Sequence, residues 1–227
     1  MARYTGPVCR LCRREGTKLF LKGDRCYSKC VIDKQKTITM PGQHGTRRSK
    51  PTEYAKRMRE KQKTRRIIGV LERQFRRYFR QASRVKGNTG ETLLRLLETR
   101  LDNVVRRLGF ASSLAAARQM VTHKRVGVNN RIVNIPSYQL KPGDRVHLTD
   151  SAKGNLWVRR SLGQALQKGL PSWLEMEGNI SAELLKTETE ANPLQNVPVA
   201  GKVKMWPARQ EMSFPVNEQF IVELYSK

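Results

Sequence analysis

The sequence contains no long hydrophobic run and comparatively few acidic residues. No stretch of about 18 consecutive apolar residues occurs, so the chain has no candidate membrane-spanning segment. Its first residues lack the apolar stretch of a secretory signal, and we expect a reducing compartment in which thiols persist. The 227 residues include 19 Asp and Glu against 45 Lys and Arg, a formal net charge of +26. A compact protein with this excess repels itself unless a polyanion neutralises it, and nucleic acid is the common partner.

The positive charge belongs to the first two thirds of the sequence. Residues 1–90 contain 26 basic and 6 acidic residues, whereas residues 91–160 contain 13 and 5. Residues 161–227 contain 6 basic and 8 acidic residues. We therefore expect the last third to pack against protein and the first two thirds to face a polyanion.

The densest basic block is residues 47–86, which contain 16 basic residues. Only Glu53, Glu60 and Glu72 are available within it for the i,i+4 pairs that support an exposed charged helix. We therefore expect phosphate, and not solvent alone, to face this block.

Hydrophobic periodicity predicts an α+β fold. Apolar residues at helical spacing predict helices at 51–63, 67–79, 93–108, 114–123 and 156–168. Alternating apolar residues predict strands at 126–128, 132–133 and 146–148, an extended piece from 171, and a final strand at 219–225. Asn129 and Asn130 suit a two-residue hairpin turn because asparagine tolerates positive φ. Gly109 is suited to ending the third helix, and Ser112 or Ser113 to capping the fourth.

These elements divide into four predicted segments, one of them a helix–helix–hairpin unit with a small mixed sheet. The segments are a cysteine-containing module (1–45), a basic helical region (46–98), the helix–helix–hairpin unit (99–161) and a C-terminal packing segment (162–227) with a polar insertion at 178–200.

All four cysteines fall within 22 residues, at the spacing C-x2-C-x13-C-x3-C. Two short-spaced thiol pairs across a loop suit a closed tetrahedral zinc site formed by Cys9, Cys12, Cys26 and Cys30. Such a metal knuckle would fold the basic N-terminus and would not catalyse a reaction. An iron–sulfur cluster is an alternative for four thiolates. Two disulfides or four unrelated free thiols are the structural alternatives, and disulfides require an oxidising compartment.

Residues 101–144 closely resemble the S-four RNA-binding module. The resemblance rests on LDNVVRRLGF at 101–110, on the helix that follows, and on the segments VNIPSY at 133–138 and KPGD at 141–144. One departure is Asn130, where a glycine usually follows the hairpin asparagine; we expect the turn to survive. The same module occurs in pseudouridine synthases and some tRNA synthetases, so it does not define a function by itself.

Motifs across the rest of the chain look like the family of small-subunit ribosomal protein four, of the bacterial or organellar type. They include PGQHG at 41–45, LERQF at 71–75, PSWLE at 171–175 and the stretch 217–227. The resemblance implies a protein of the cytoplasmic ribosome, or of an organellar one, that binds small-subunit rRNA directly and nucleates assembly. It also implies a position at the channel through which mRNA enters, contact with small-subunit ribosomal protein five, and an effect on decoding accuracy. Neither membrane binding nor homo-oligomerisation is expected.

Two departures from the family concern the cysteines and the insertion. Some members lack the full cysteine set, so metal is not essential to the family function. The stretch at about 181–200 is longer than is typical, and the resemblance does not assign it a partner.

The candidate RNA contacts combine the basic clusters with the positions that match the module. The resemblance implies that Arg47, Arg48 and Lys50 face incoming mRNA. The rRNA contacts expected within the module are Arg118, His123, Lys124, Arg125 and Asn129. Those expected in the N-terminal region are Arg10, Arg13, Arg14, Arg65, Arg66, Arg73, Arg76 and Arg77. His123 has an alternative role, since a histidine at a helix C-terminus also complements the helix dipole.

Two other functions compete with a structural role in the ribosome. An RNA-modifying enzyme would need a pocket of titratable groups, yet only five acidic residues lie in 91–160 and Asp102 reads as a packing or capping residue. No phosphate loop or dinucleotide glycine pattern occurs. A DNA-binding zinc finger would need paired Cys and His ligands, which the spacing does not provide. We therefore expect no catalytic residue.

Overall fold

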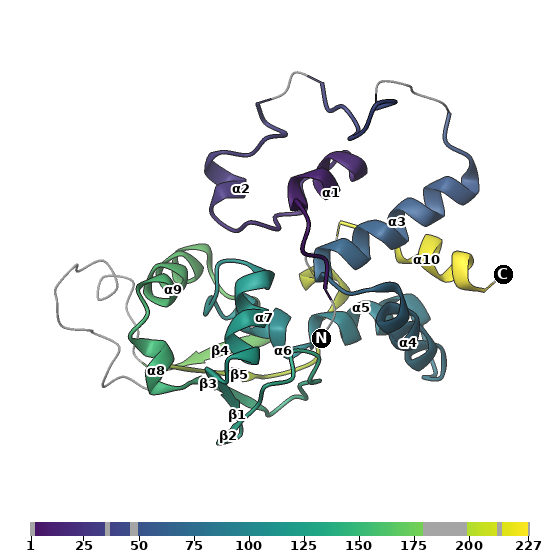
Figure 1. Ribbon diagram of the computed structural model, residues 1–227. Helices are drawn as coiled ribbons and strands as arrows, with labels where there is room; N and C mark the ends of the chain where they lie inside the picture. The colour runs from purple at the N-terminus through teal and green to yellow at the C-terminus, as the bar shows by residue number, and fades with distance from the viewer. Residues whose placement is uncertain (1–2, 35–36, 46–49, 179–198, 213–214, 227) are drawn as a thin grey trace. The chain divides into compact units, whose positions relative to one another are not determined.

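In a computed structural model the chain forms two compact units (Figure 1). The structure describes residues 3–34, 37–45, 50–178, 199–212 and 215–226. Unit 1 comprises Met1–Leu94 and Ser213–Lys227, and unit 2 comprises Arg95–Met212. The predicted packing segment 162–227 thus contributes to both units. No described helix is long and apolar enough to cross a membrane.

Unit 1 consists of helices. They are α1 (Val8–Glu15), α2 (Arg25–Ser28), α3 (Glu53–Ile68), α4 (Glu72–Ser83), most of α5 (Thr89–Glu98) and α10 (Glu218–Tyr225). Thr52 caps α3 by accepting a hydrogen bond from the Ala55 amide at 3.2 Å. The predicted break after residue 63 is wrong, because α3 continues to Ile68 and ends at Gly69 (φ +65). The glycine, and not the loss of apolar periodicity, ends the helix.

The predicted strand at 219–225 is also wrong, since these residues form helix α10. Asn217 caps it, accepting from the Gln219 amide at 3.0 Å, and α10 lies along α3 (Figure 1). The Tyr225 ring stacks on Phe79, with centroids 4.6 Å apart. Its hydroxyl donates to the Glu72 carboxylate at 2.7 Å, and burial together with this bond raises the pKa of Tyr225. A short run of β-favouring apolar residues is ambiguous by periodicity, and here packing against α3 decides in favour of the helix.

Unit 2 contains helices and one sheet. Its helices are α6 (Leu101–Arg107), α7 (Leu114–Thr122), α8 (Asp150–Lys153), α9 (Leu156–Lys168) and the 3-10 turn η1 (Arg209–Glu211). Its strands are β1 (Val126–Val128), β2 (Arg131–Ile132), β3 (Arg145–Leu148), β4 (Leu174–Glu177) and β5 (Ala200–Val203), in the order β2-β1-β3-β5-β4. Every pairing is antiparallel, so the predicted mixed sheet is corrected to an antiparallel one.

The predicted hairpin is confirmed. Asn129 and Asn130 have φ values of +48° and +66°, and Val128 pairs with Arg131 across the two-residue turn. Positive φ at both turn positions matches the twist of the flanking strands, so Asn130 replaces glycine without altering the turn. Of the predicted insertion 178–200, residues 179–198 lie outside the described residues, and Ala200 already begins β5.

The core of unit 2 lies between the sheet and helices α6, α7 and α9. Fully buried members include Leu101, Val104 and Val105 of α6. Gly109 ends α6 with φ +80, as predicted, and a Cβ on it would lie 2.2 Å from the Ala165 Cβ. The α6–α9 approach therefore requires glycine for both backbone and space. Ser113 is the cap of α7.

One helix was predicted where two exist. The apolar stripe from 93 to 108 is interrupted at Thr99 and Arg100, between α5 and α6. The Leu101 amide donates to the Tyr138 carbonyl at 2.9 Å, and the Leu140 amide donates to the Thr99 carbonyl at 3.0 Å. These bonds to a distant segment replace helical ones, which the local pattern does not reveal.

Candidate nucleic-acid interface

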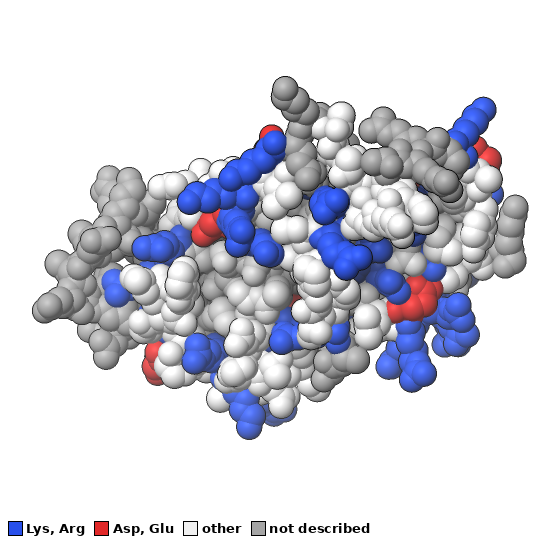
Figure 2. Space-filling view, turned by 45° about the horizontal axis from the view of Figure 1, so that its top comes forward, with Lys and Arg blue, Asp and Glu red and all other residues white. Residues whose placement is uncertain are grey.

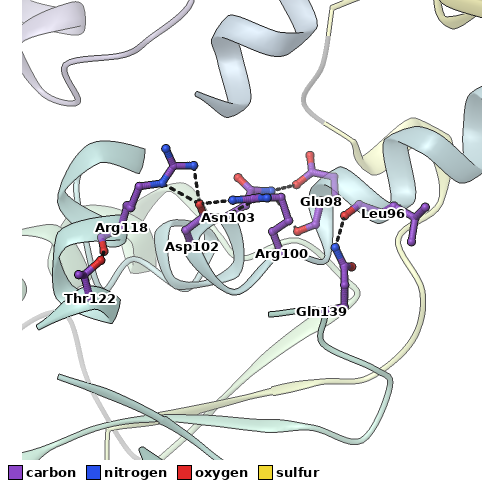
Figure 3. Close-up of polar contacts among 8 residues, drawn as sticks. All are labelled: Leu96, Glu98, Arg100, Asp102, Asn103, Arg118, Thr122 and Gln139. Carbon is purple, nitrogen blue, oxygen red and sulfur yellow. Dashed lines mark hydrogen bonds and ion pairs between the residues drawn. The ribbon is translucent and has the colours of Figure 1, made fainter. Parts of the chain in front are cut away.

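Three buried charges of unit 2 form an ion triad at the start of α6 (Figure 3). Asp102 is fully buried and accepts two hydrogen bonds from Arg100, at 3.0 and 2.7 Å. It also accepts two from Arg118 of α7, at 3.2 and 2.9 Å. A carboxylate removed from water needs such compensation, because a buried unpaired charge is strongly destabilising. The triad therefore fixes α7 relative to α6, and Asp102 acts as the packing residue expected from the sequence.

Arg118 was expected to contact RNA, and the structure gives it an internal partner. Its side chain is 9% exposed, and its guanidinium is directed at Asp102 (Figure 3). A side chain with this contact holds α7 against α6.

A second buried network lies beside the triad. Glu98 is buried and accepts from Arg107 at 2.6 Å. The Asn103 side-chain amide also donates to Glu98 (Figure 3). Gln139 donates to the Leu96 carbonyl at 3.0 Å and accepts from Thr99 at 2.8 Å. Since Glu98 and Asp102 are both buried and paired, these acids have structural partners and not a catalytic geometry.

Unpaired cations of unit 2 lie next to the end of α7 and on the hairpin. Among the described residues, Lys124, Arg125, Arg131 and Lys141 form no ion pair, and all except the half-buried Arg125 are exposed. His123 is exposed and directly follows α7. These side chains can meet phosphate without first breaking an internal contact.

Asn129, another expected RNA contact, holds the hairpin in place. Its amide nitrogen donates to Asp144 at 2.8 Å, and its amide oxygen accepts from the Arg145 backbone at 2.9 Å. Asp144 also accepts from the Lys141 amide, within the turn before β3. Asn129 thus ties two turns together and fixes the hairpin tip.

In unit 1, the positive charge of helix α3 is compensated by acidic side chains of the same unit. All seven of its basic side chains are ion-paired with acids of α1, α3, α4 or α10: Lys56, Arg57, Arg59, Lys61, Lys63, Arg65 and Arg66. Buried Glu15 of α1 pairs with both Arg59 and Arg66. Burial raises the pKa of Glu15, and these two arginines oppose that rise. Arg65 and Arg66, two expected rRNA contacts, therefore already have partners.

Helix α4 differs sharply from α3. Arg73, Arg76, Arg77 and Arg80 are exposed, and among the described residues they form no ion pair. Their spacing puts them on one side of the helix, opposite buried Phe75 and Tyr78. We call these four the α4 arginine stripe. Figure 2 shows one face of the molecule, on which basic side chains gather in groups and acidic ones are sparse.

The other expected contacts lie near the cysteines or outside the described residues. Arg10 and Arg14 are exposed on α1, while Arg13 donates to the Thr39 carbonyl at 3.1 Å. Lys50 is exposed, and its predicted neighbours Arg47 and Arg48 lie outside the described residues.

The four cysteines border one small cavity. Cys9 and Cys12 lie one turn apart on α1, Cys26 lies on α2, and Cys30 follows it. The cavity measures about 20 Å³, and all four thiols are free. Burial raises the pKa of Cys12, and the other three sulfurs add to the rise. In the described part of the chain, no three Cys, His, Asp or Glu side chains lie close enough together to form a metal cluster.

Comparison with known proteins gives matches along the whole chain. Residues 3–98 match the family described as ribosomal protein S4/S9 N-terminal domain, and residues 99–146 match the S4 domain. The chain is 54% identical to small ribosomal subunit protein uS4 of Natranaerobius thermophilus, over 100% of both chains. It is 53% identical to uS4A of Symbiobacterium thermophilum and to uS4 of Dictyoglomus turgidum, again over 100% of both chains.

The buried triad yields a test of what holds the interface. Replacing Asp102 by Asn removes the buried carboxylate that Arg100 and Arg118 share, so we expect about 3–5 kcal/mol less stability in urea unfolding. The matched control is Asp150→Asn, because the Asp150 side chain is 89% exposed and its pair with Lys153 contributes little. A D102N midpoint equal to that of D150N would contradict the role of the triad.

Proposed function

The chain belongs to the uS4 family of small ribosomal subunit proteins and is a non-enzymatic, rRNA-binding constituent of the subunit; we propose that the α4 arginine stripe is a principal phosphate-binding surface. The observation that carries this proposal is the contrast between α3 and α4. Each cation of α3 already has an acidic partner, whereas the four exposed arginines of α4 have none among the described residues. A cation that neutralises a phosphate releases counterions from RNA. An unpaired cation can do so without breaking an ion pair within the protein, whereas a paired cation would first have to lose its acidic partner.

A second surface of the proposal belongs to unit 2. His123, Lys124 and Arg125 follow α7 directly, and Arg131 lies just beyond the hairpin turn. Folded RNA is recognised mainly through its shape and backbone, so a rigid arrangement of cations suits it. In this proposal Arg118 and Asn129 keep that arrangement rigid from within.

Two parts of the proposal rest on the family resemblance alone. One is early binding that nucleates assembly, which an RNA footprint at the first assembly stage tests. The other is contact with small-subunit ribosomal protein five, which crosslinking within assembled subunits tests.

Salt dependence distinguishes the two helices of unit 1. We expect the triple change Arg73→Gln, Arg76→Gln and Arg77→Gln to weaken binding to a small-subunit rRNA transcript and to reduce the slope of log K against log salt by about 2–3. The matched control removes three paired cations of α3 by Lys56→Gln, Arg57→Gln and Lys63→Gln, and its slope should change less. Equal changes in both triple variants would contradict the assignment to α4.

We propose that Cys9, Cys12, Cys26 and Cys30 bind one structural Zn²⁺. The shared cavity and the two short spacings support this, and closure of the thiols around the ion would join α1 to α2. A bound zinc keeps the thiols ionised and contributes no open coordination position. The surrounding cations Arg10, Lys22, Arg25 and Lys29 would then be displayed on a rigid scaffold.

Elemental analysis tests the zinc proposal. Protein purified without oxygen should contain about one zinc per chain, and the double variant Cys9→Ser and Cys26→Ser should contain almost none. The control Ser28→Ala alters a residue between two of the ligands and should keep the metal. Less than half an equivalent of zinc, with iron and sulfide in its stead, would refute the zinc site in favour of a cluster.

Finally, we propose that Lys50, together with Arg47 and Arg48, faces mRNA where it enters the subunit. Lys50 is exposed and lies two residues before Thr52, the cap of α3. Changing all three to Gln should slow translation through structured mRNA, while the amount of the protein in purified subunits stays unchanged. Loss of the triple variant from subunits would mean that these residues serve assembly and would overturn the proposal.

A further inference from the structure

A groove in unit 2 contains a side chain that the rRNA-binding surfaces above do not use. It lies between the end of α7 and the start of α9 and has a volume of about 260 Å³. Ser112, Gln119, His123 and Arg125 contribute polar groups to it, and Trp157 contributes an aromatic ring. The groove is slightly smaller than the cavities of about 300 Å³ and above that usually take small-molecule ligands. Its size suits one flat ring system.

Trp157 is unusually exposed for its type. Its exposed fraction is 72%, the largest among the exposed large hydrophobic side chains of the described residues. Burial of this ring therefore contributes little to the fold, although indole is costly to leave in water. The buried residues of α9 are Val158, Ser161 and Leu162, which hold the helix in place without the ring.

The charge around the groove favours an anionic partner. Among the described residues that line it there is no acid, whereas the cation Arg125 lines it and Lys124 is the chain neighbour of Arg125. The Arg160 guanidinium carbon lies 5.8 Å from the centre of the Trp157 ring, close enough for a cation–π contact. An aromatic platform beside unpaired cations is the arrangement that proteins use to hold unstacked bases of RNA.

From these observations we propose that the groove binds a single unpaired nucleobase of small-subunit rRNA, stacked on Trp157. Gln119, His123 and Ser112 supply hydrogen-bonding groups for the base edge or sugar, and Arg125 binds the adjoining phosphate. This rests on the proposed rRNA-binding function and adds a specific site to it. Phosphate contacts position the protein, and a captured base adds a contact that only an unpaired nucleotide can make.

Fluorescence of the full-length protein tests the site directly. Trp173 is buried and Trp206 is 43% exposed, so Trp206→Phe leaves Trp157 as the one exposed indole. We expect a small-subunit rRNA transcript to quench the emission of this variant at saturation. An unchanged Trp157 emission when the RNA is fully bound would overturn the base site while leaving rRNA binding intact. Emission that changes only in complete subunits, and not with rRNA alone, would overturn it in favour of a protein partner.

Affinity measurements across a salt series separate stacking from charge. Trp157→Ala should bind the transcript roughly tenfold more weakly with an unchanged salt slope, because it removes a stacking contact and no phosphate contact. Trp157→Phe keeps a ring and should recover most of the affinity. The control Trp206→Ala removes an exposed indole outside the groove and should bind like the unaltered protein. Equal affinity of Trp157→Ala and the unaltered protein would overturn the proposal, and failure of the unaltered protein to bind at all would overturn the rRNA-binding function itself.

Discussion

A carboxylate shared by two guanidinium groups inside unit 2 is the constraint on which the RNA-reading region depends. Asp102 stands at the start of α6, and its two partners approach from the α5–α6 junction and from α7. Burying three charges is tolerable only when each is compensated, so the triad permits one arrangement of these segments and penalises others. The triad thereby positions α7 and the cations that follow it, while Asn129 holds the hairpin. The network of Glu98, Asn103 and Arg107 extends it along α6.

Positive charge in this protein serves two distinct purposes. On α3 the cations join helices to one another through acids, including Glu15 of α1, Glu72 of α4 and Glu223 of α10. On α4 the four arginines of the stripe are exposed and have no acidic partner within the described part of the chain. The count of 45 Lys and Arg therefore overstates the cations that a polyanion meets, because acids inside the fold compensate part of them, and the net charge of +26 is the excess that remains.

Local signals in the sequence predicted the elements that local chemistry determines. The hairpin at Asn129 and Asn130, the end of α6 at Gly109 and the cap of α7 each depend on one or two residues, and each prediction was confirmed. Errors arose where distant segments decide the outcome. The final apolar run became a helix because α3 offers it a packing surface, and α5 separates from α6 because residues near Gln139 supply backbone partners. The same cause explains why ion pairing of the basic residues was not predicted. The cations of α3 pair with acids that include Glu15 and Glu223, which are far away in sequence, and Arg118 pairs with Asp102 on another helix. Trp157 is only weakly indicated as a binding residue by the sequence, where it is an aromatic residue close to Arg159 and Arg160 at the start of a helix. Its high exposure in the structure is what distinguishes it from a core residue.

The packing of α10 on α3 also determines the order in which the chain can be completed during synthesis. Unit 2 is a single continuous stretch, so it can close as soon as its last strand has left the ribosome that makes it. Unit 1 cannot, because helix α10, which buries Ile221 and bonds to Glu72 through Tyr225, is translated after all of unit 2. Domains generally fold as units as they emerge from the ribosome. Here unit 2 can therefore fold before unit 1, although most of unit 1 comes earlier in the sequence. The most basic part of the protein is thus the last to mature, and the region that reads RNA through the S4 domain is ready before it.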